Sequence, residues 1–191
     1  MKTRKFFLFA LLIIALVGCN VNNSNDNSRV NNDPDLTEPN PGSTSESYTS
    51  IREFQELFGQ SLKNDFLEIK ISKYILTLSM DISMDRKLLK KLQNTANDFS
   101  FNFADITGNT EISNSLLHQQ KYVNGNLLVK QLNKKNNHVK IIQYLPLQKN
   151  LDIEQLDYLK KPENYEFQIL DENDDPVFIL AGLDLRTMDN P

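Results

Sequence analysis

The sequence predicts an α+β fold, with a mostly antiparallel β-sheet and two or three short helices packed on it. Two observations favour this class. Segments in which apolar and polar residues alternate outnumber segments with helical spacing. Short hairpin connections between these segments outnumber the long crossovers that parallel strands need. We expect residues 50–191 to form this fold as a single domain, preceded by two segments of different composition, 1–18 and 19–49.

Residues 1–18 have the composition of a secretory signal peptide. Lys2, Arg4 and Lys5 precede an apolar run that extends from Phe6 to Val17. A charged start, a short apolar core and small residues before a cleavage point are typical of such peptides. The run is shorter than the roughly 20 residues that a membrane-spanning helix needs.

The end of this segment, Leu16-Val17-Gly18-Cys19, resembles the lipobox of bacterial lipoproteins. The resemblance implies that the Cys19 thiol receives a diacylglyceryl group and that the signal is cleaved before Cys19. A thiolate is strongly nucleophilic, which suits this chemistry. Asn20 stands where an Asp resembles an inner-membrane retention signal, so outer-membrane sorting is favoured if the organism has an outer membrane. An ordinary signal peptide with a chance cysteine, or an uncleaved anchor, is the alternative.

Residues 19–49 are expected to form a disordered acidic tether. The segment is rich in Asn, Ser and Pro and poor in aliphatic residues, so it cannot bury enough apolar surface to offset its ordering entropy. As a flexible coil it would span on the order of 30 Å. It could be a spacer that lifts the domain towards a partner, or a generic leader that keeps the lipid accessible.

Charge and cysteine content exclude several classes of function. The chain has a formal net charge of −4, and removal of the three cations in residues 1–18 makes the mature chain more acidic. This acidity, without a basic stripe, argues against nucleic-acid binding and against contact of the domain itself with an anionic membrane. Cys19 is the only cysteine, so the domain has no disulfide, cysteine nucleophile or Cys-ligated metal.

In the first half of the domain, Ser50 is expected to cap a helix that runs through Phe58 and is ended or interrupted by Gly59. Alternation over residues 67–82 predicts strands, with a change of parity at Ser72-Lys73 that indicates a bulge or a bend between two strands. A helix is predicted from Ser83 to about residue 98. Its lysines, Lys87, Lys90 and Lys91, are interpreted as a solvated helix face, with a docking patch as the alternative.

In the second half, Phe99, Phe101 and Phe103 alternate with smaller residues and predict a half-buried strand with a core row of aromatic rings. A short helix is expected within 112–123. The dipeptide Asn124-Gly125 is a strong hairpin signal. The remaining predictions are strands at 126–132 and 139–145, a helix at 151–160, and a final hairpin that pairs 165–169 with 177–180.

No motif for catalysis or cofactor binding is found, and we expect no cofactor. Asp171, Asn173 and Asp175 match the first, third and fifth ligands of a calcium loop. Pro176 and Gly182 then stand where such a loop needs Gly and Glu, so these acids are weak calcium candidates in what reads as an ordinary turn. His118 and His138 have no companion that would suggest zinc.

These observations lead to the hypothesis of a non-enzymatic lipoprotein of the bacterial cell envelope. It would be held at the membrane by lipidated Cys19 and would bind another protein, as an accessory to an envelope assembly or as a surface-displayed binder. Two alternatives remain. One is a lipid-tethered hydrolase that uses carboxylates, and the other is a carrier of a small hydrophobic ligand.

Overall fold

The computed structural model describes residues 46–118, 120–133 and 135–188. The predicted signal peptide, the lipid attachment at Cys19 and most of the predicted tether lie outside the described residues. Within the described ranges, eight strands form two antiparallel sheets and five short α-helices accompany them. The α+β prediction is confirmed, with two sheets in place of one.

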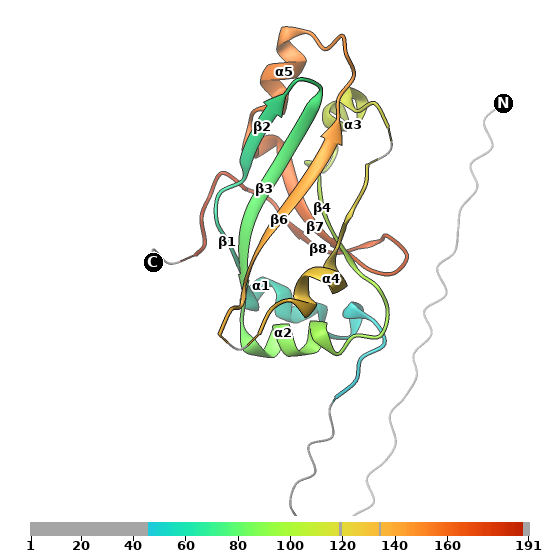
Figure 1. Cartoon of the computed structure of the whole chain (residues 1–191), viewed down its shortest axis with the longest axis vertical. Coiled ribbons are helices and arrows are strands. Elements are labelled where there is room, and N and C mark those ends of the chain that lie inside the picture. The colour runs from blue at the N-terminus through green and yellow to red at the C-terminus, as the bar shows by residue number, and fades with distance from the viewer. Residues whose placement is uncertain (1–45, 119, 134, 189–191) are drawn as a thin grey trace, which may run out of the picture. The chain divides into compact units, whose positions relative to one another are not determined.

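The first sheet is built around the long strand β3 (Ile75–Met84). β1 (Leu62–Asn64) and β2 (Glu68–Ser72) follow one another along one edge of β3, and β6 (His138–Pro146) pairs with the other edge (Figure 1). Ser72 pairs with Ile75, so a two-residue turn joins β2 to β3. The change of parity at Ser72-Lys73 is therefore a hairpin, not a bulge. This turn carries no glycine signal because Lys73 itself adopts the left-handed conformation, with φ of 56°.

The second sheet has the order β5-β4-β7-β8. Its strands are β5 (Val123–Asn124), β4 (Ser100–Asp105), β7 (Tyr165–Leu170) and β8 (Pro176–Leu180). The predicted final hairpin is confirmed as the pair β7 and β8. The three predicted phenylalanines are buried, and the rings of Phe101 and Phe103 both contact Phe167 across the β4–β7 pair.

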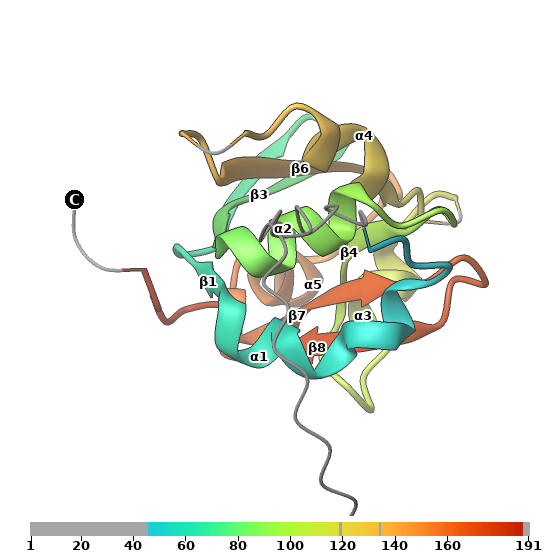
Figure 2. The ribbon, with the colours of Figure 1, turned by 90° about the horizontal axis from the view of Figure 1, so that it is seen from below.

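The core lies between the two sheets, which face each other (Figures 1 and 2). A buried polar residue joins them where β6 approaches β4. The Gln143 side-chain oxygen accepts the Phe103 backbone N–H at 2.8 Å, and its nitrogen donates to the Asn102 side-chain oxygen at 3.0 Å and to the Lys121 carbonyl at 2.9 Å. These bonds satisfy groups that would otherwise be buried without partners.

The helices gather at the two ends of the sheets, and do not cover one face (Figure 1). One end carries the 3₁₀ helix η1 (Ile51–Leu57), α1 (Phe58–Ser61), α2 (Arg86–Gln93) and α4 (Gly125–Lys130). The other carries α3 (Glu111–Ser115), α5 (Ile153–Leu159) and the 3₁₀ turn η2 (Pro162–Asn164).

Three predicted helix boundaries move. Ser50 caps η1 as predicted, in a capping box with Glu53. Gly59 does not end the helical segment, because α1 continues through it to Ser61. α2 begins after Asp85, whose carboxylate accepts the Leu88 N–H at 2.7 Å, while Ser83 still belongs to β3. It ends at Gln93, short of the predicted residue 98.

The predicted hairpin at Asn124-Gly125 and the strand at 126–132 are wrong. Asn124 is the N-cap of α4, and its side-chain oxygen accepts the Leu127 N–H at 2.8 Å. Asn favours both hairpin turns and helix N-caps, so the same dipeptide fits either structure. The strand at 139–145 and the helix at 151–160 are confirmed as β6 and α5.

Candidate functional site

The outer faces of β2, β3 and β6 form a continuous surface that no helix of the described residues covers (Figure 1). We call this surface the sheet face. It consists of the residues of these strands that point away from the core: Glu68, Lys70, Ser72, Ile75, Thr77, Ser79, Asp81, His138, Lys140, Ile142, Tyr144. Their positions follow from the antiparallel register, because alternate residues of a strand point to opposite faces.

One half of the sheet face is apolar. Tyr144 is 62% exposed, Ile142 is 37% exposed and Ile75 is 39% exposed. Tyr144 lies opposite Thr77, and Ile142 lies opposite Ser79, so the larger side chains of β6 stand beside small ones of β3. Exposed aromatic and branched side chains on a flat sheet are suited to contact with another protein.

A row of charges crosses all three strands beside this apolar half. Lys140 on β6 donates to Glu68 on β2 at 3.0 Å and lies 3.6 Å from Asp81 on β3. Glu68 also accepts the Ser79 hydroxyl at 3.1 Å. The hydrogen bond from Lys140 lowers the pKa of the Glu68 carboxyl, and the same bond raises the pKa of the Lys140 ammonium. Both groups are therefore charged at neutral pH and give this face a fixed pattern of charge.

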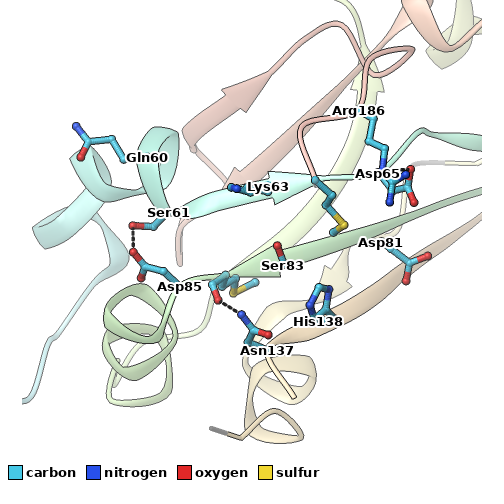
Figure 3. A pocket seen from close by; sticks show the side chains of 12 residues that line it. Gln60, Ser61, Lys63, Asp65, Asp81, Ser83, Asp85, Asn137, His138 and Arg186 are labelled. Atoms are coloured by element: carbon cyan, nitrogen blue, oxygen red, sulfur yellow. Dashed lines mark hydrogen bonds and ion pairs between the residues drawn. The ribbon is translucent and has the colours of Figure 1, made fainter. Parts of the chain in front are cut away.

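Beyond the charged row lies a hollow of about 610 Å³, which we call the polar hollow (Figure 3). Its lining comes from the end of α1, β1 and the residue after it, β3, the start of β6, the N-cap of α2 and the C-terminal segment: Gln60, Ser61, Lys63, Asp65, Asp81, Ser83, Met84, Asp85, Asn137, His138, Arg186, Met188. The C-terminal segment is fixed here, since Thr187 and Met188 donate backbone N–H groups to the Asn64 carbonyl.

Each carboxylate of the polar hollow has a partner within the described residues. Asp85 caps α2 and accepts the Ser61 hydroxyl at 2.6 Å. Asp65 lies 3.4 Å from the Arg186 guanidinium, and Asp81 belongs to the charged row. These contacts give the three acids structural roles. His138, one of the two predicted histidines, also lines this hollow, whereas His118 is exposed after α3.

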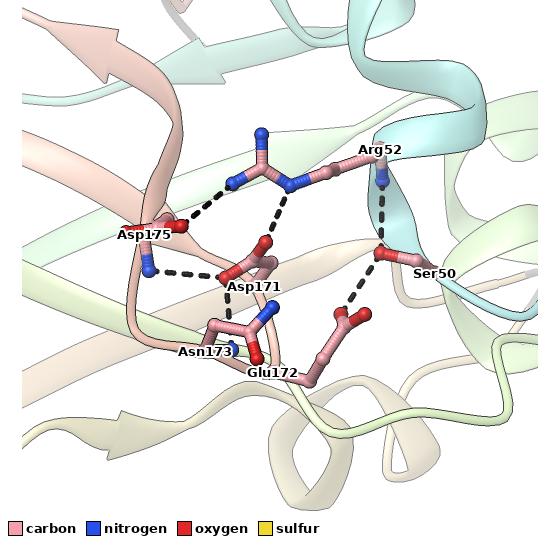
Figure 4. A network of polar contacts seen from close by, with 6 residues as sticks. All are labelled: Ser50, Arg52, Asp171, Glu172, Asn173 and Asp175. Atoms are coloured by element: carbon pink, nitrogen blue, oxygen red, sulfur yellow. Dashed lines mark hydrogen bonds and ion pairs between the residues drawn. The ribbon is translucent and has the colours of Figure 1, made fainter.

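The weak calcium candidates lie in the turn between β7 and β8 (Figure 4). The Asp171 carboxylate accepts the backbone N–H groups of Asn173 and Asp175 at 2.9 and 3.0 Å, and its other oxygen accepts a hydrogen bond from Arg52. A second Arg52 nitrogen lies 3.3 Å from the Asp175 carboxylate. The structure thus brings Asp171 and Asp175 together around a guanidinium group. In the described ranges, no three His, Cys, Asp or Glu side chains are arranged to hold a metal ion.

This network fastens the first described residues of the chain to the second sheet. Besides the contacts of Arg52, the Ser50 hydroxyl donates to the Glu172 carboxylate at 2.9 Å (Figure 4). Burial alone would raise the pKa of the Asp171 carboxyl, but the hydrogen bonds from Arg52 and the turn backbone outweigh it, so its pKa lies below the ordinary value. The bond to Asp171 raises the pKa of Arg52 in turn.

The sequence did not reveal the sheet face, although one signal for it was present. β6 reads Ile141-Ile142-Gln143-Tyr144, and the usual pattern of apolar residues inside and polar residues outside would not place Gln143 inside while Ile142 and Tyr144 point outwards. Such a reversal, with a polar residue buried between two exposed apolar ones, can indicate a surface with a binding role.

Comparison with models of protein families, with curated proteins and with solved structures gives no match to this chain. Among the helices of the described residues, none combines the length and the apolar character required to cross a membrane. Function is therefore inferred from the sequence of the N-terminus and from the surfaces described above.

Proposed function

We propose that this chain is a lipid-anchored protein of the bacterial cell envelope that acts by binding another protein through the sheet face. Cys19 would carry the lipid, and Asn20 supports sorting to the outer membrane where the organism has one. The observation that carries the binding proposal is the exposed cluster of Tyr144, Ile142 and Ile75 beside a fixed row of charges. Aromatic residues at the centre of an interface, with polar groups around them, are typical of protein recognition.

The shape and chemistry of this face favour a folded protein over a small molecule. A flat three-stranded surface offers area but little enclosure, whereas small-ligand sites enclose most of their ligand. The polar hollow is adjacent, and it could receive a polar side chain of the same partner. Its three carboxylates hold structural contacts, so the hollow itself supports recognition more than acid–base chemistry.

Site-specific photocrosslinking in intact cells tests the proposal. A benzophenone amino acid is placed at Tyr144 in the full-length chain, and at Ile153 on α5 as a control, since Ile153 is 69% exposed but lies on a helix outside the sheet face. We expect a discrete adduct from position 144 and none of that mass from position 153. Identical adduct patterns at both positions would contradict a specific site.

The captured partner, identified by mass spectrometry, must then bind the purified full-length chain. We expect Tyr144→Ser to weaken this binding by at least tenfold, as for an aromatic residue at the centre of an interface. The matched substitution Ile153→Ser should leave the affinity unchanged. Equal affinities for all three chains would refute the role of the sheet face.

Proteinase K treatment of intact cells then decides between the two forms of the proposal. Digestion of the domain while a periplasmic control protein survives would place the sheet face outside the cell. Protection until the envelope is opened would identify an inward-facing accessory protein. In either case the crosslinking result at position 144 stands as an independent test of the binding surface.

A further inference from the structure

Exposed cations gather at the end of the domain formed by α2 and α4, although the chain as a whole has a net negative charge. We call these residues the basic end: Arg86, Lys87, Lys90, Lys130, Lys135. α2 contains no acidic residue, and the whole sequence from 112 to 151 contains neither Asp nor Glu. α2 and α4 are in contact, and both are visible when the molecule is seen from this end (Figure 2).

Acidic side chains border the basic end and offset part of its charge, since Glu46 lines the same hollow as Lys87 and Lys90. Glu46 lies 3.8 Å from Lys91, the one lysine of α2 whose ammonium group is held in place, 3.9 Å from the centre of the Tyr48 ring. Asp85 caps α2 and also bonds to Ser61. Within the described ranges, none of the five cations of the basic end has a carboxylate at ion-pair distance.

The chain enters the domain beside this same end. The Tyr48 N–H donates to the Asn94 carbonyl at 3.2 Å, and the Ala96 N–H donates to the Tyr48 carbonyl at 2.8 Å, which fixes residues 46–49 next to the end of α2. The predicted tether therefore joins the described domain beside the end of α2.

An exposed apolar side chain lies beside one of these cations. Leu127 on α4 is 61% exposed, and Lys130 follows it three residues later, on the same side of the helix. Lysines around an exposed leucine are the pattern of surfaces that bind the interface of a bilayer, where the cations meet phosphate groups and the leucine enters the acyl boundary.

We infer that the basic end docks on the anionic phospholipid headgroups of the membrane that holds the lipid anchor. The position of the membrane beside this end relies on the proposed lipidation of Cys19, whereas the affinity of the basic end for headgroups does not. Each Lys or Arg close to an anionic bilayer raises partitioning roughly fivefold. Docking through α2 and α4 would hold the sheet face to the side, accessible to a partner.

Vesicle sedimentation tests this inference without the lipid anchor. The mature chain from residue 19 on, carrying Cys19→Ser, is mixed with vesicles of phosphatidylglycerol and phosphatidylcholine, or of phosphatidylcholine alone. We expect binding to the anionic vesicles only, weakened by added salt, because the contact is electrostatic. Equal sedimentation with both kinds of vesicle, or with neither, would overturn the inference.

Matched charge variants locate the contact. Lys87→Gln with Lys90→Gln removes two cations from the basic end and should lower partitioning roughly 25-fold, the product of two fivefold effects. Lys121→Gln with Lys149→Gln makes the same change in net charge at exposed positions outside the basic end and should leave binding within about twofold. Equal losses of vesicle binding in the two variants would show that only the net charge matters, and would refute a docking site.

The acidic tether is the competing occupant of the basic end. Replacement of Asp26, Asp33, Asp35 and Glu38 by their amides removes all of its acids except Glu46, which stays beside Lys91. If anionic vesicles bind only after this change, the basic end is covered by the tether and the membrane inference is wrong. A failure here leaves the crosslinking test at Tyr144 unaffected, so the two proposals can fail separately.

Discussion

Gly125, the first residue of α4, is required by the packing of Phe99. A Cβ atom built on Gly125 would lie 2.2 Å from a ring carbon of Phe99 and 3.0 Å from its carbonyl oxygen. The Gly125 N–H also donates to this carbonyl at 2.9 Å, so the two backbones cannot separate without losing a bond. The glycine that suggested a hairpin is needed for close approach of a helix to a buried ring.

We therefore predict that Gly125→Ala lowers the free energy of unfolding by about 2 to 3 kcal/mol, the cost of overpacking a closed site. Urea unfolding followed by circular dichroism measures the change. Gly59→Ala is the matched control, because a Cβ atom at Gly59 would lie 4.0 Å from its nearest neighbour and the residue belongs to α1. It should leave stability unchanged or raise it by up to about 1 kcal/mol. Similar losses in both variants would show that the Phe99 contact is not the cause.

At the scale of elements, the link between η1 and the β7–β8 turn depends on pH. Because the pKa of Asp171 is lowered in the folded state, its carboxylate stabilises the fold at pH values above its ordinary pKa of 3.8. This contribution is lost as the pH falls through the lower, folded-state pKa. Asp171→Asn should therefore reduce the free energy of unfolding by about 1 to 3 kcal/mol at neutral pH.

The difference between Asp171→Asn and the native chain should shrink as the pH falls below 3.8, because Asp171 then gains a proton in the unfolded chain before it does so in the folded chain. Urea titrations at neutral pH and at about pH 3 measure it. Asp174→Asn is the control in the same turn, since Asp174 is exposed and its left-handed conformation, with φ of 64°, suits Asn equally well. A difference for Asp171→Asn that does not change with pH would exclude the charged link.

The elements that alternation alone specifies could be predicted, and those that depend on distant contacts could not. β4, β6 and the β7–β8 hairpin carry clear patterns with turn residues between them. The two-residue turn at Lys73 and the helix after Asn124 were missed, because a lysine with positive φ leaves no sequence signal and an Asn N-cap imitates a hairpin. The sheet face required knowledge that β6 pairs with β3, which are far apart in the sequence.

On both proposals, the whole molecule would combine two attachments of different kinds. A covalent lipid on Cys19 would hold the chain at the membrane in any orientation of the domain. The basic end would favour one of these orientations through its charge. The net charge alone favours a domain that avoids an anionic surface. Cations gathered on α2 and α4, however, create a local field that the total charge of the chain does not describe.

The covalent attachment gives the last prediction. In cells grown with an alkyne fatty acid, the native chain should become labelled and sediment with membranes, because two or more acyl chains give stable anchoring. Cys19→Ser removes the thiol that would accept the diacylglyceryl group, so label should be lost and the chain should appear in the soluble fraction. Lys87→Gln with Lys90→Gln should keep full labelling and sediment normally, since charge removal does not touch the lipid. Labelling that persists in Cys19→Ser would contradict the lipoprotein proposal. Loss of the label in that variant alone would assign the anchor to Cys19, and the orientation of the domain on the membrane would then depend on the basic end.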